Sequence, residues 1–129
     1  MSTLRGVVVQ GCGHFTVRMT KFEEVFRKAT GESLVPGTLN IEVARPIPIK
    51  VDIRITGEDI NEPEQDLLIE KCAINGIPAY RIRPYNLTTG GGGHGDHILE
   101  IACSKRIANA TVGSPLEVTL FRDIDPPDR

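Results

Sequence analysis

The chain contains no tryptophan, and aromatic residues make up only 5% of its 129 positions. Surfaces that bind single-stranded nucleic acids are built from aromatic side chains on which bases stack, so no such surface is expected. The formal net charge is −2 at pH 7, and the basic footprint of a nucleic-acid-binding domain is therefore also missing. The composition predicts no nucleic-acid partner.

Long apolar runs are absent as well, and no segment approaches the roughly 20 residues of a membrane-spanning helix. The N-terminus, from Met1 to Arg5, lacks the apolar core of a signal peptide. The three cysteines form neither a CxxC pair nor a zinc-binding spacing: Cys12, Cys72 and Cys103. Such scattered cysteines are typical of reduced thiols, and we expect a cytoplasmic protein without a membrane partner.

The sequence has neither a Walker phosphate-binding loop nor the motif set of the protein kinases, which excludes a standard ATP-using phosphotransferase. The composition, with 40% hydrophobic and 25% charged residues, is ordinary for a globular protein. At this length, and without an internal repeat or a linker, we expect a single domain over residues 1–129.

Short apolar segments with alternating or β-branched residues predict a mainly β protein. Asn75 and Gly76 separate two of these segments and favour a hairpin turn, because both residues accept positive φ. Closely spaced strands with few helices favour a small closed or partly closed barrel over a parallel α/β sheet. The expected strands cover residues 4–10, 15–19, 38–44, 51–55, 67–74, 77–83, 98–102 and 116–121, and residues 56–66 are expected to form a loop.

One well-formed helix is predicted over residues 21–30. Thr20 and Glu23 have the spacing of a capping box. Gly31 follows the helix and fits the left-handed conformation that ends helices. Apolar residues recur at helical spacing on one face of this segment: Phe22, Val25, Phe26 and Ala29.

A candidate metal site follows this helix, in the segment Pro-Gly-Thr-Leu-Asn-Ile at residues 36–41. Thr38 and Asn40 are two residues apart, so both side chains share one face if the segment is a strand. Their neutral oxygens suit a hard cation that also binds phosphates, such as Mg²⁺. The alternative is a turn and a strand with two polar side chains facing water.

Two further segments carry groups suited to phosphate. Gly11 and Gly13 allow backbone N–H groups to converge on phosphate oxygens, although the same glycines are also common in simple hairpin turns. Lys105 and Arg106 can offset the negative charge of a triphosphate, with a solvated basic pair as the alternative.

Three segments of the chain resemble the archaeal CTP-dependent riboflavin kinases. The first is Gly-Val-Val-Val-Gln-Gly-Cys-Gly at residues 6–13, and the second runs through the helix to the Gly-Thr-Leu-Asn motif, over residues 22–41. The third is Ile-Leu-Glu-Ile-Ala at residues 98–102. The resemblance implies a six-stranded cradle-loop barrel. It also implies transfer of the γ-phosphoryl group of CTP to the 5′-hydroxyl of riboflavin, giving FMN and CDP, with Mg²⁺ as cofactor.

The resemblance also implies roles for individual residues. Thr38 and Asn40 inherit the role of magnesium ligands, while Thr89 and Glu100 inherit contact with the flavin. The family has a basic nucleotide-binding run after its late strand. This chain keeps basic residues there, Lys105 and Arg106, but the order of residues differs from that of the family. A glycine run precedes Glu100 here and is not typical of the family. The residues that inherit contact with CTP are Gly11, Cys12, Gly13, His14 and Phe15.

Glu100 interrupts an apolar segment, and its same-face neighbours in a strand are Ile98 and Ala102. A carboxylate there either lines the wall of a pocket or lies at an edge facing water. In a pocket, desolvation would raise its pKa and suit it to accept the hydroxyl proton. We adopt the weaker interpretation, in which Glu100 orients the acceptor hydroxyl.

Histidines near the glycine run allow a second interpretation of this region. His94, Asp96 and His97, with His14 as a fourth ligand, are compatible with a transition-metal site. The glycines at 90–93 would cost conformational entropy to order, so a lid over the substrate or an unstructured loop are the alternatives.

The leading hypothesis is therefore a riboflavin kinase whose substrates are CTP and riboflavin. A phosphotransferase with a different small acceptor on the same barrel is the second hypothesis. The third is a non-catalytic module that binds a flavin or a nucleotide. The sequence predicts no oligomeric state.

Overall fold

The computed structural model of the chain describes residues 1–11, 13–85 and 95–124. Seven strands, two α-helices and one 3₁₀ turn follow one another in these ranges. Their order is β1 (Ser2–Val9), α1 (His14–Lys21), α2 (Glu23–Thr30), β2 (Leu39–Glu42), β3 (Ile53–Ile55), η1 (Gly57–Ile60), β4 (Leu67–Ile74), β5 (Ile77–Pro84), β6 (Ile98–Cys103) and β7 (Pro115–Leu120).

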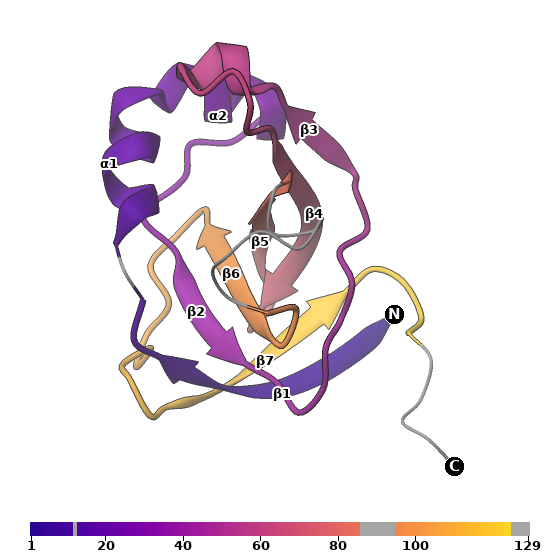
Figure 1. Cartoon of the computed structure of the whole chain (residues 1–129). Helices are drawn as coiled ribbons and strands as arrows, with labels where there is room; N and C mark the ends of the chain where they lie inside the picture. The colour runs from indigo at the N-terminus through magenta and orange to yellow at the C-terminus, as the bar shows by residue number, and fades with distance from the viewer. Residues whose placement is uncertain (12, 86–94, 125–129) are drawn as a thin grey trace.

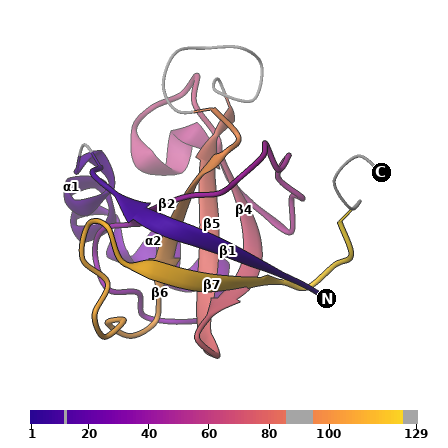
Figure 2. The ribbon, with the colours of Figure 1, turned by 90° about the horizontal axis from the view of Figure 1, so that it is seen from below.

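Six of the strands close into an antiparallel barrel, in the order β4-β5-β6-β2-β1-β7 and back to β4. The remaining strand, β3, pairs with β4 and extends the sheet on the outside of this ring. The two helices lie together on one side of the barrel (Figure 1), and a perpendicular view shows β1 and β7 crossing in front of β5 (Figure 2). The predicted mainly β fold with a six-stranded barrel is confirmed.

The hairpin between β4 and β5 forms at the predicted turn. Asn75 and Gly76 have φ of 51° and 79°, the left-handed values that this kind of two-residue turn requires. Eight residue pairs align β4 with β5, from Leu67 opposite Pro84 to Ile74 opposite Ile77. Local turn chemistry therefore sets the register of the longest strand pair in the barrel.

The predicted strand over residues 15–19 is wrong, because this segment belongs to α1. Phe15 and Met19 are 5% and 3% exposed, whereas Val17 between them is 72% exposed. Residues four apart share a helix face, so the two buried side chains point toward the barrel together. In a window of five residues, alternation fits a strand and a helix equally well.

The predicted helix over residues 21–30 is confirmed in its second part, since α2 begins at Glu23 and ends before Gly31, whose φ is 79°. A break at Phe22 separates α2 from α1. The predicted capping box is wrong, because the Thr20 hydroxyl donates to the Thr16 carbonyl instead of capping α2. Several strand boundaries differ by one or two residues; β2, for example, begins at Leu39, after Thr38. The expected loop over residues 56–66 contains η1.

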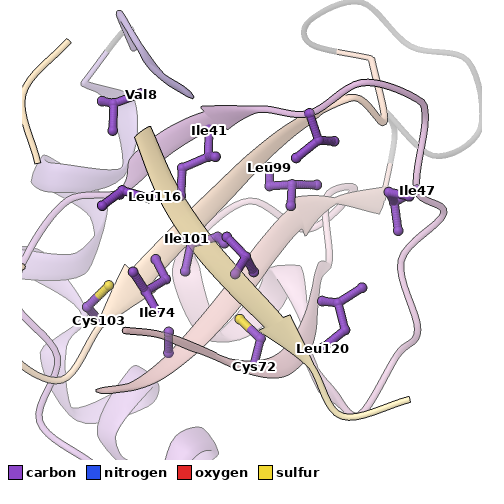
Figure 3. Close-up of a cluster of buried hydrophobic side chains, with 13 residues drawn as sticks. Val8, Ile41, Ile47, Cys72, Ile74, Leu99, Ile101, Cys103, Leu116 and Leu120 are labelled. Atoms are coloured by element: carbon purple, nitrogen blue, oxygen red, sulfur yellow. The ribbon is translucent and has the colours of Figure 1, made fainter. Parts of the chain in front are cut away.

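Two hydrophobic clusters hold the fold together. One fills the barrel interior (Figure 3), and the other lies between the outer face of β4 and β5 and the helices. The interior cluster contains Val8, Ile41, Val43, Ile47, Cys72, Ile74, Ala79, Leu99, Ile101, Cys103, Leu116, Val118 and Leu120. The helix-side cluster contains Phe15, Met19, Phe26, Ile55, Ile60, Leu67, Ile69, Tyr80, Ile82 and Ala102.

A buried ionic group accompanies the interior cluster. Glu70 and Arg81 are cross-strand partners, 0% and 1% exposed, and alternation places both on the barrel-interior face. The Glu70 carboxylate lies 2.6 Å from Arg122 Nε and 3.8 Å from Arg81 Nη1, and it accepts a 3.0 Å hydrogen bond from the Lys50 N–H. Burial lowers the pKa of Arg81 to about 10, although the Glu70 carboxylate opposes this shift.

No helix in the described ranges has the length and apolar character that crossing a membrane requires.

Candidate functional site

A cavity of about 430 Å³ lies where the end of β1, the start of α1 and the segments around residues 35–40 and 105–112 meet. This volume is within the usual range for sites that bind one small molecule. Its lining residues are Val8, Val9, Gln10, Gly11, Gly13, Phe15, Thr16, Val35, Pro36, Gly37, Thr38, Leu39, Asn40, Ile101, Cys103, Lys105, Arg106, Ile107, Ala110 and Val112.

Most of the predicted binding residues line this one cavity, although they come from distant parts of the sequence. They are Gly11, Gly13, Phe15, Thr38, Asn40, Lys105 and Arg106. Cys12 and Thr89 lie outside the described residues, as do the glycines at 90–93 and His94. His14 begins α1, but its side chain is not described.

Gly11 packs directly against the side chain of Asn40. A Cβ atom at position 11 would lie 2.1 Å from Asn40 Nδ2 and 3.0 Å from its Cγ, so no larger residue fits there without displacing the carboxamide. Asn40 itself is only 6% exposed. The glycine-rich turn and the predicted metal ligand therefore form one packed unit.

The turn before Thr38 is packed against α1 in a similar way. Gly37 has φ of 104°, a conformation that favours glycine, and its N–H donates to Met19 Sδ over 3.4 Å. A Cβ atom at Gly37 would lie 3.0 Å from Thr16 Oγ1. Thr38 is half-buried beside this contact. The helix α1 thus contributes to the placement of Thr38 as well as to the cavity wall.

The N-terminus of α1 opens onto the cavity. Gly13 is the N-cap residue with φ of 76°; it has no side chain to cap the helix, and the first turn of α1 carries no acidic residue. Backbone N–H groups at a helix start and the helix dipole both favour an anion. Among the described residues that line the cavity, the charged ones are Lys105 and Arg106, which are both exposed and both positive.

The inner wall of the cavity is apolar and continues into the barrel core. Burial raises the pKa of the Cys103 thiol in this wall to about 11. Cys103 is therefore a protonated, apolar wall group and not a thiolate nucleophile at neutral pH. The residues of this wall that belong to the interior cluster or pack against it are Val8, Leu39, Ile101, Cys103, Ile107 and Ala110.

Glu100 is not among the lining residues, but it is the direct cross-strand partner of Asn40. Side chains of such pairs are on the same face, with Cβ atoms about 5 Å apart. Its neighbours Leu99 and Ile101 belong to the interior cluster, so Glu100 lies on the outer face of the barrel, half-buried. The predicted acceptor-binding carboxylate is thus next to the predicted metal ligand, outside the cavity.

Mg²⁺ fits the donor set of this site. It needs one or two protein oxygens and otherwise keeps waters and phosphate oxygens. The Thr38 hydroxyl and the Asn40 carboxamide supply two neutral oxygens on one cavity lining. Glycine at position 11 leaves the space that the Asn40 carboxamide occupies.

Two of the four residues named for the alternative transition-metal site, Asp96 and His97, have described side chains. Asp96 Oδ1 lies 2.9 Å from Arg83 Nε, so this carboxylate is engaged in an ion pair. His97 Nε2 lies 4.0 Å from Glu42 Oε2, in a hollow on the outside of the barrel. Within the described part of the chain, no group of three or more histidine, cysteine or acidic side chains could hold a metal ion.

Sequence reasoning missed Thr16 and Gln10, which also line the cavity. Thr16 was missed because residues 15–19 were assigned to a strand, which hid the helix start behind Gly13. The buried pair Phe15 and Met19, four residues apart, is the signal that indicates this helix.

Comparison with models of protein families gives no match to this chain, and comparison with curated proteins gives none either.

Proposed function

We propose that the protein is a cytoplasmic CTP-dependent riboflavin kinase, which transfers the γ-phosphoryl group of CTP to the 5′-hydroxyl of riboflavin. One observation carries this proposal. Thr38 and Asn40 of the Gly-Thr-Leu-Asn motif line the same cavity as the glycine-rich turn and a basic pair. Phosphoryl transfer needs mainly positioning and neutralisation of charge, and these are the groups that supply both.

The nucleotide occupies the cavity in this proposal. Its nucleoside part packs against the apolar inner wall, and its phosphates face the N-terminus of α1. The N–H groups at this helix start are suited to phosphate oxygens because no side-chain cap or acidic residue competes for them. Lys105 and Arg106 offset the remaining negative charge from the opposite segment.

Thr38 and Asn40 would hold a magnesium ion beside the phosphates. When bound, Mg²⁺ supplies neutralisation of the charge on the β- and γ-phosphate oxygens. The protein's own part is to hold two oxygens in fixed positions, with Gly11 packed against the Asn40 carboxamide and the Gly37 turn packed against Thr16 of α1.

Riboflavin approaches from the outer face of the barrel, where Glu100 lies beside Asn40. Glu100 accepts a hydrogen bond from the 5′-hydroxyl and orients its oxygen toward the γ-phosphorus. That oxygen forms the new P–O bond while the bond to the β–γ bridging oxygen breaks. The hydroxyl proton leaves to water, and the products are FMN and CDP.

The test is incubation of the protein with riboflavin, Mg²⁺ and each of the four common nucleoside triphosphates, with FMN measured by chromatography and fluorescence. We expect FMN with CTP. Thr38→Val removes the hydroxyl at nearly constant volume and should lower the rate about a hundredfold. The matched control is Thr3→Val, on an exposed position of β1. Absence of FMN with all four nucleotides would overturn the proposal.

A different small acceptor is the second candidate, and the position of Glu100 favours it. The cavity defines a place for the nucleotide, whereas the acceptor is defined by one half-buried carboxylate on the outer face. A panel of vitamins and nucleosides with γ-labelled CTP separates the two candidates. Labelled product from another acceptor, with none from riboflavin, would select the second.

A further inference from the structure

The helix whose start faces the cavity is tied to a distant part of the chain by an ion pair. Arg18 Nη2 lies 2.6 Å from Glu62 Oε1, and the two side chains are only 18% and 37% exposed. The Arg18 guanidinium also lies over the ring of Phe15, 5.5 Å from its centroid. Phe15 is 5% exposed and lines the cavity. One arginine thus joins the cavity wall to a residue 44 positions away.

Glu62 is itself held firmly. Its N–H donates to the Gly57 carbonyl over 2.8 Å, and its carbonyl accepts from the Gln65 N–H over 2.9 Å. The Gly57 N–H in turn donates to Asp66 Oδ1 over 2.8 Å. A Cβ atom at Gly57 would lie 1.9 Å from the Glu62 carbonyl oxygen, so this turn is tightly closed. Glu62 therefore offers Arg18 a fixed partner.

A break in the helical backbone separates α1 from α2. Phe22, with φ of −114° and ψ of 38°, interrupts the helical backbone, so α2 does not continue α1 as one rod. Figure 1 shows α1, α2 and the short turn η1 on the same side of the barrel. The Arg18–Glu62 pair links α1 to the segment after η1, in addition to the packing of Phe15 and Met19 in the helix-side cluster.

We propose that the Arg18–Glu62 pair positions the nucleotide-binding end of the cavity. The pair holds α1 so that its first-turn N–H groups and the Phe15 ring face the cavity. Both residues are positioning residues that act through α1 and do not touch the ligand. This inference rests on the proposed function, because it assigns the phosphates to the start of α1.

The residue type supports this role. A planar guanidinium can pair with a carboxylate and lie over an aromatic ring at the same time, whereas an ammonium group is a compact point charge. Arg18→Lys should therefore keep the ion pair but weaken the contact with Phe15. The chain also provides a matched control, since Arg27 Nη2 and Glu24 Oε2 form a 2.6 Å pair on α2. Neither of these two residues lines the cavity.

The experiment measures Mg²⁺·CTP and riboflavin binding separately, by calorimetry and by flavin fluorescence, together with the melting temperature. We expect Arg18→Gln and Glu62→Gln each to weaken Mg²⁺·CTP binding about tenfold while riboflavin affinity changes less than about twofold. The double variant should be no worse than either single variant, because the two side chains act through one contact. Arg18→Lys should fall between, and Arg27→Gln should bind as the wild type.

The outcomes separate this inference from the proposed function. Wild-type affinity for Mg²⁺·CTP in Arg18→Gln overturns the inference alone, as does an equal loss for both ligands, which indicates a merely structural role. Additive losses in the double variant also overturn it. A wild-type protein that binds none of the four nucleoside triphosphates overturns the proposed function and this inference together. Selective, non-additive loss of nucleotide affinity supports both.

Discussion

Replacement of Gly11 by alanine tests the packing that places Asn40, the proposed metal ligand. The new Cβ atom would lie 2.1 Å from Asn40 Nδ2, whereas non-bonded atoms rest about 3.5 Å apart. The carboxamide must therefore move by roughly 1.4 Å, or the glycine-rich turn must open by as much. In either case the oxygen of Asn40 and the backbone around position 11 no longer face the ligand together.

The expected loss follows from this displacement. A misplacement of about 1 Å near the reacting groups can lower a rate about a hundredfold. We expect kcat/KM for CTP to fall about a hundredfold, equivalent to about 2.7 kcal/mol of transition-state stabilisation. The free energy of unfolding should fall by only about 1–3 kcal/mol, the usual cost of overpacking.

The assay is steady-state FMN formation at varied CTP concentration, with unfolding in urea as the check on folding. Gly113→Ala is the control, because a new Cβ at Gly113 would have no heavy atom within 4 Å, unlike one at Gly11, and Gly113 does not line the cavity. Its φ of 93° makes an alanine there strained. It should lose stability and keep its affinity for CTP. A folded Gly11→Ala protein with wild-type kcat/KM would refute the argument that Gly11 positions Asn40.

Three further predictions concern stability and thiol reactivity. Glu70→Ala leaves Arg122 and its neighbours without their buried carboxylate. Urea unfolding should show that the free energy of unfolding falls by about 3–5 kcal/mol. A fall of less than about 1 kcal/mol would contradict this expectation. The pKa of Asp66 is held below its usual value, first by the Gly57 N–H and then by a neighbouring arginine. The stability that ionised Asp66 contributes is fully present above its pKa in the unfolded chain, about 3.9. It is lost as the pH falls through the lower pKa of the folded protein. The urea midpoints of Asp66→Asn and wild type should therefore differ at pH 7 and converge in acid, whereas a constant difference would count against the ion pair. The raised pKa of Cys103 keeps its thiol protonated at pH 8, so mass spectrometry should find slow alkylation by iodoacetamide until urea unfolds the chain; rapid labelling of the folded protein would contradict its burial.

Much of the barrel follows from local sequence signals. The left-handed pair at Asn75 and Gly76 predicts the hairpin, and Gly31 predicts the end of α2, because both depend on backbone conformations of a few residues. Seven of the eight expected strands lie within a few residues of the observed ones, with β3 shorter than expected, whereas residues 15–19 belong to α1. Closure of six strands follows from their close spacing, since so short a chain with few helices has little else to cover its sheet faces.

The remaining features depend on contacts between distant residues. The five residues from Phe15 to Met19 fit either a strand or a helix, and only packing against the barrel selects the helix. The pair between Arg18 and Glu62 joins positions 44 apart, which no local pattern predicts. For the same reason no local pattern indicates that Gly11 packs on the Asn40 carboxamide.

The location of Glu100 depends on a local sequence pattern and on a contact between distant residues. Alternation along its strand predicts that its side chain shares a face with Ile98 and Ala102. In the structure this face points away from the barrel interior, which the side chains of the intervening residues fill. Its pairing with Asn40 is a matter of sheet register, which depends on how β2 and β6 align. The register brings the predicted acceptor-binding carboxylate next to the predicted metal ligand, as the proposed transfer requires.

A crystal structure with Mg²⁺ and a non-hydrolysable CTP analogue tests the central claim most directly. We predict a metal ion about 2.1 Å from both Thr38 Oγ1 and Asn40 Oδ1, in contact with phosphate oxygens, with the remaining phosphates at the start of α1. A bound metal and triphosphate remote from these two oxygens would contradict the account.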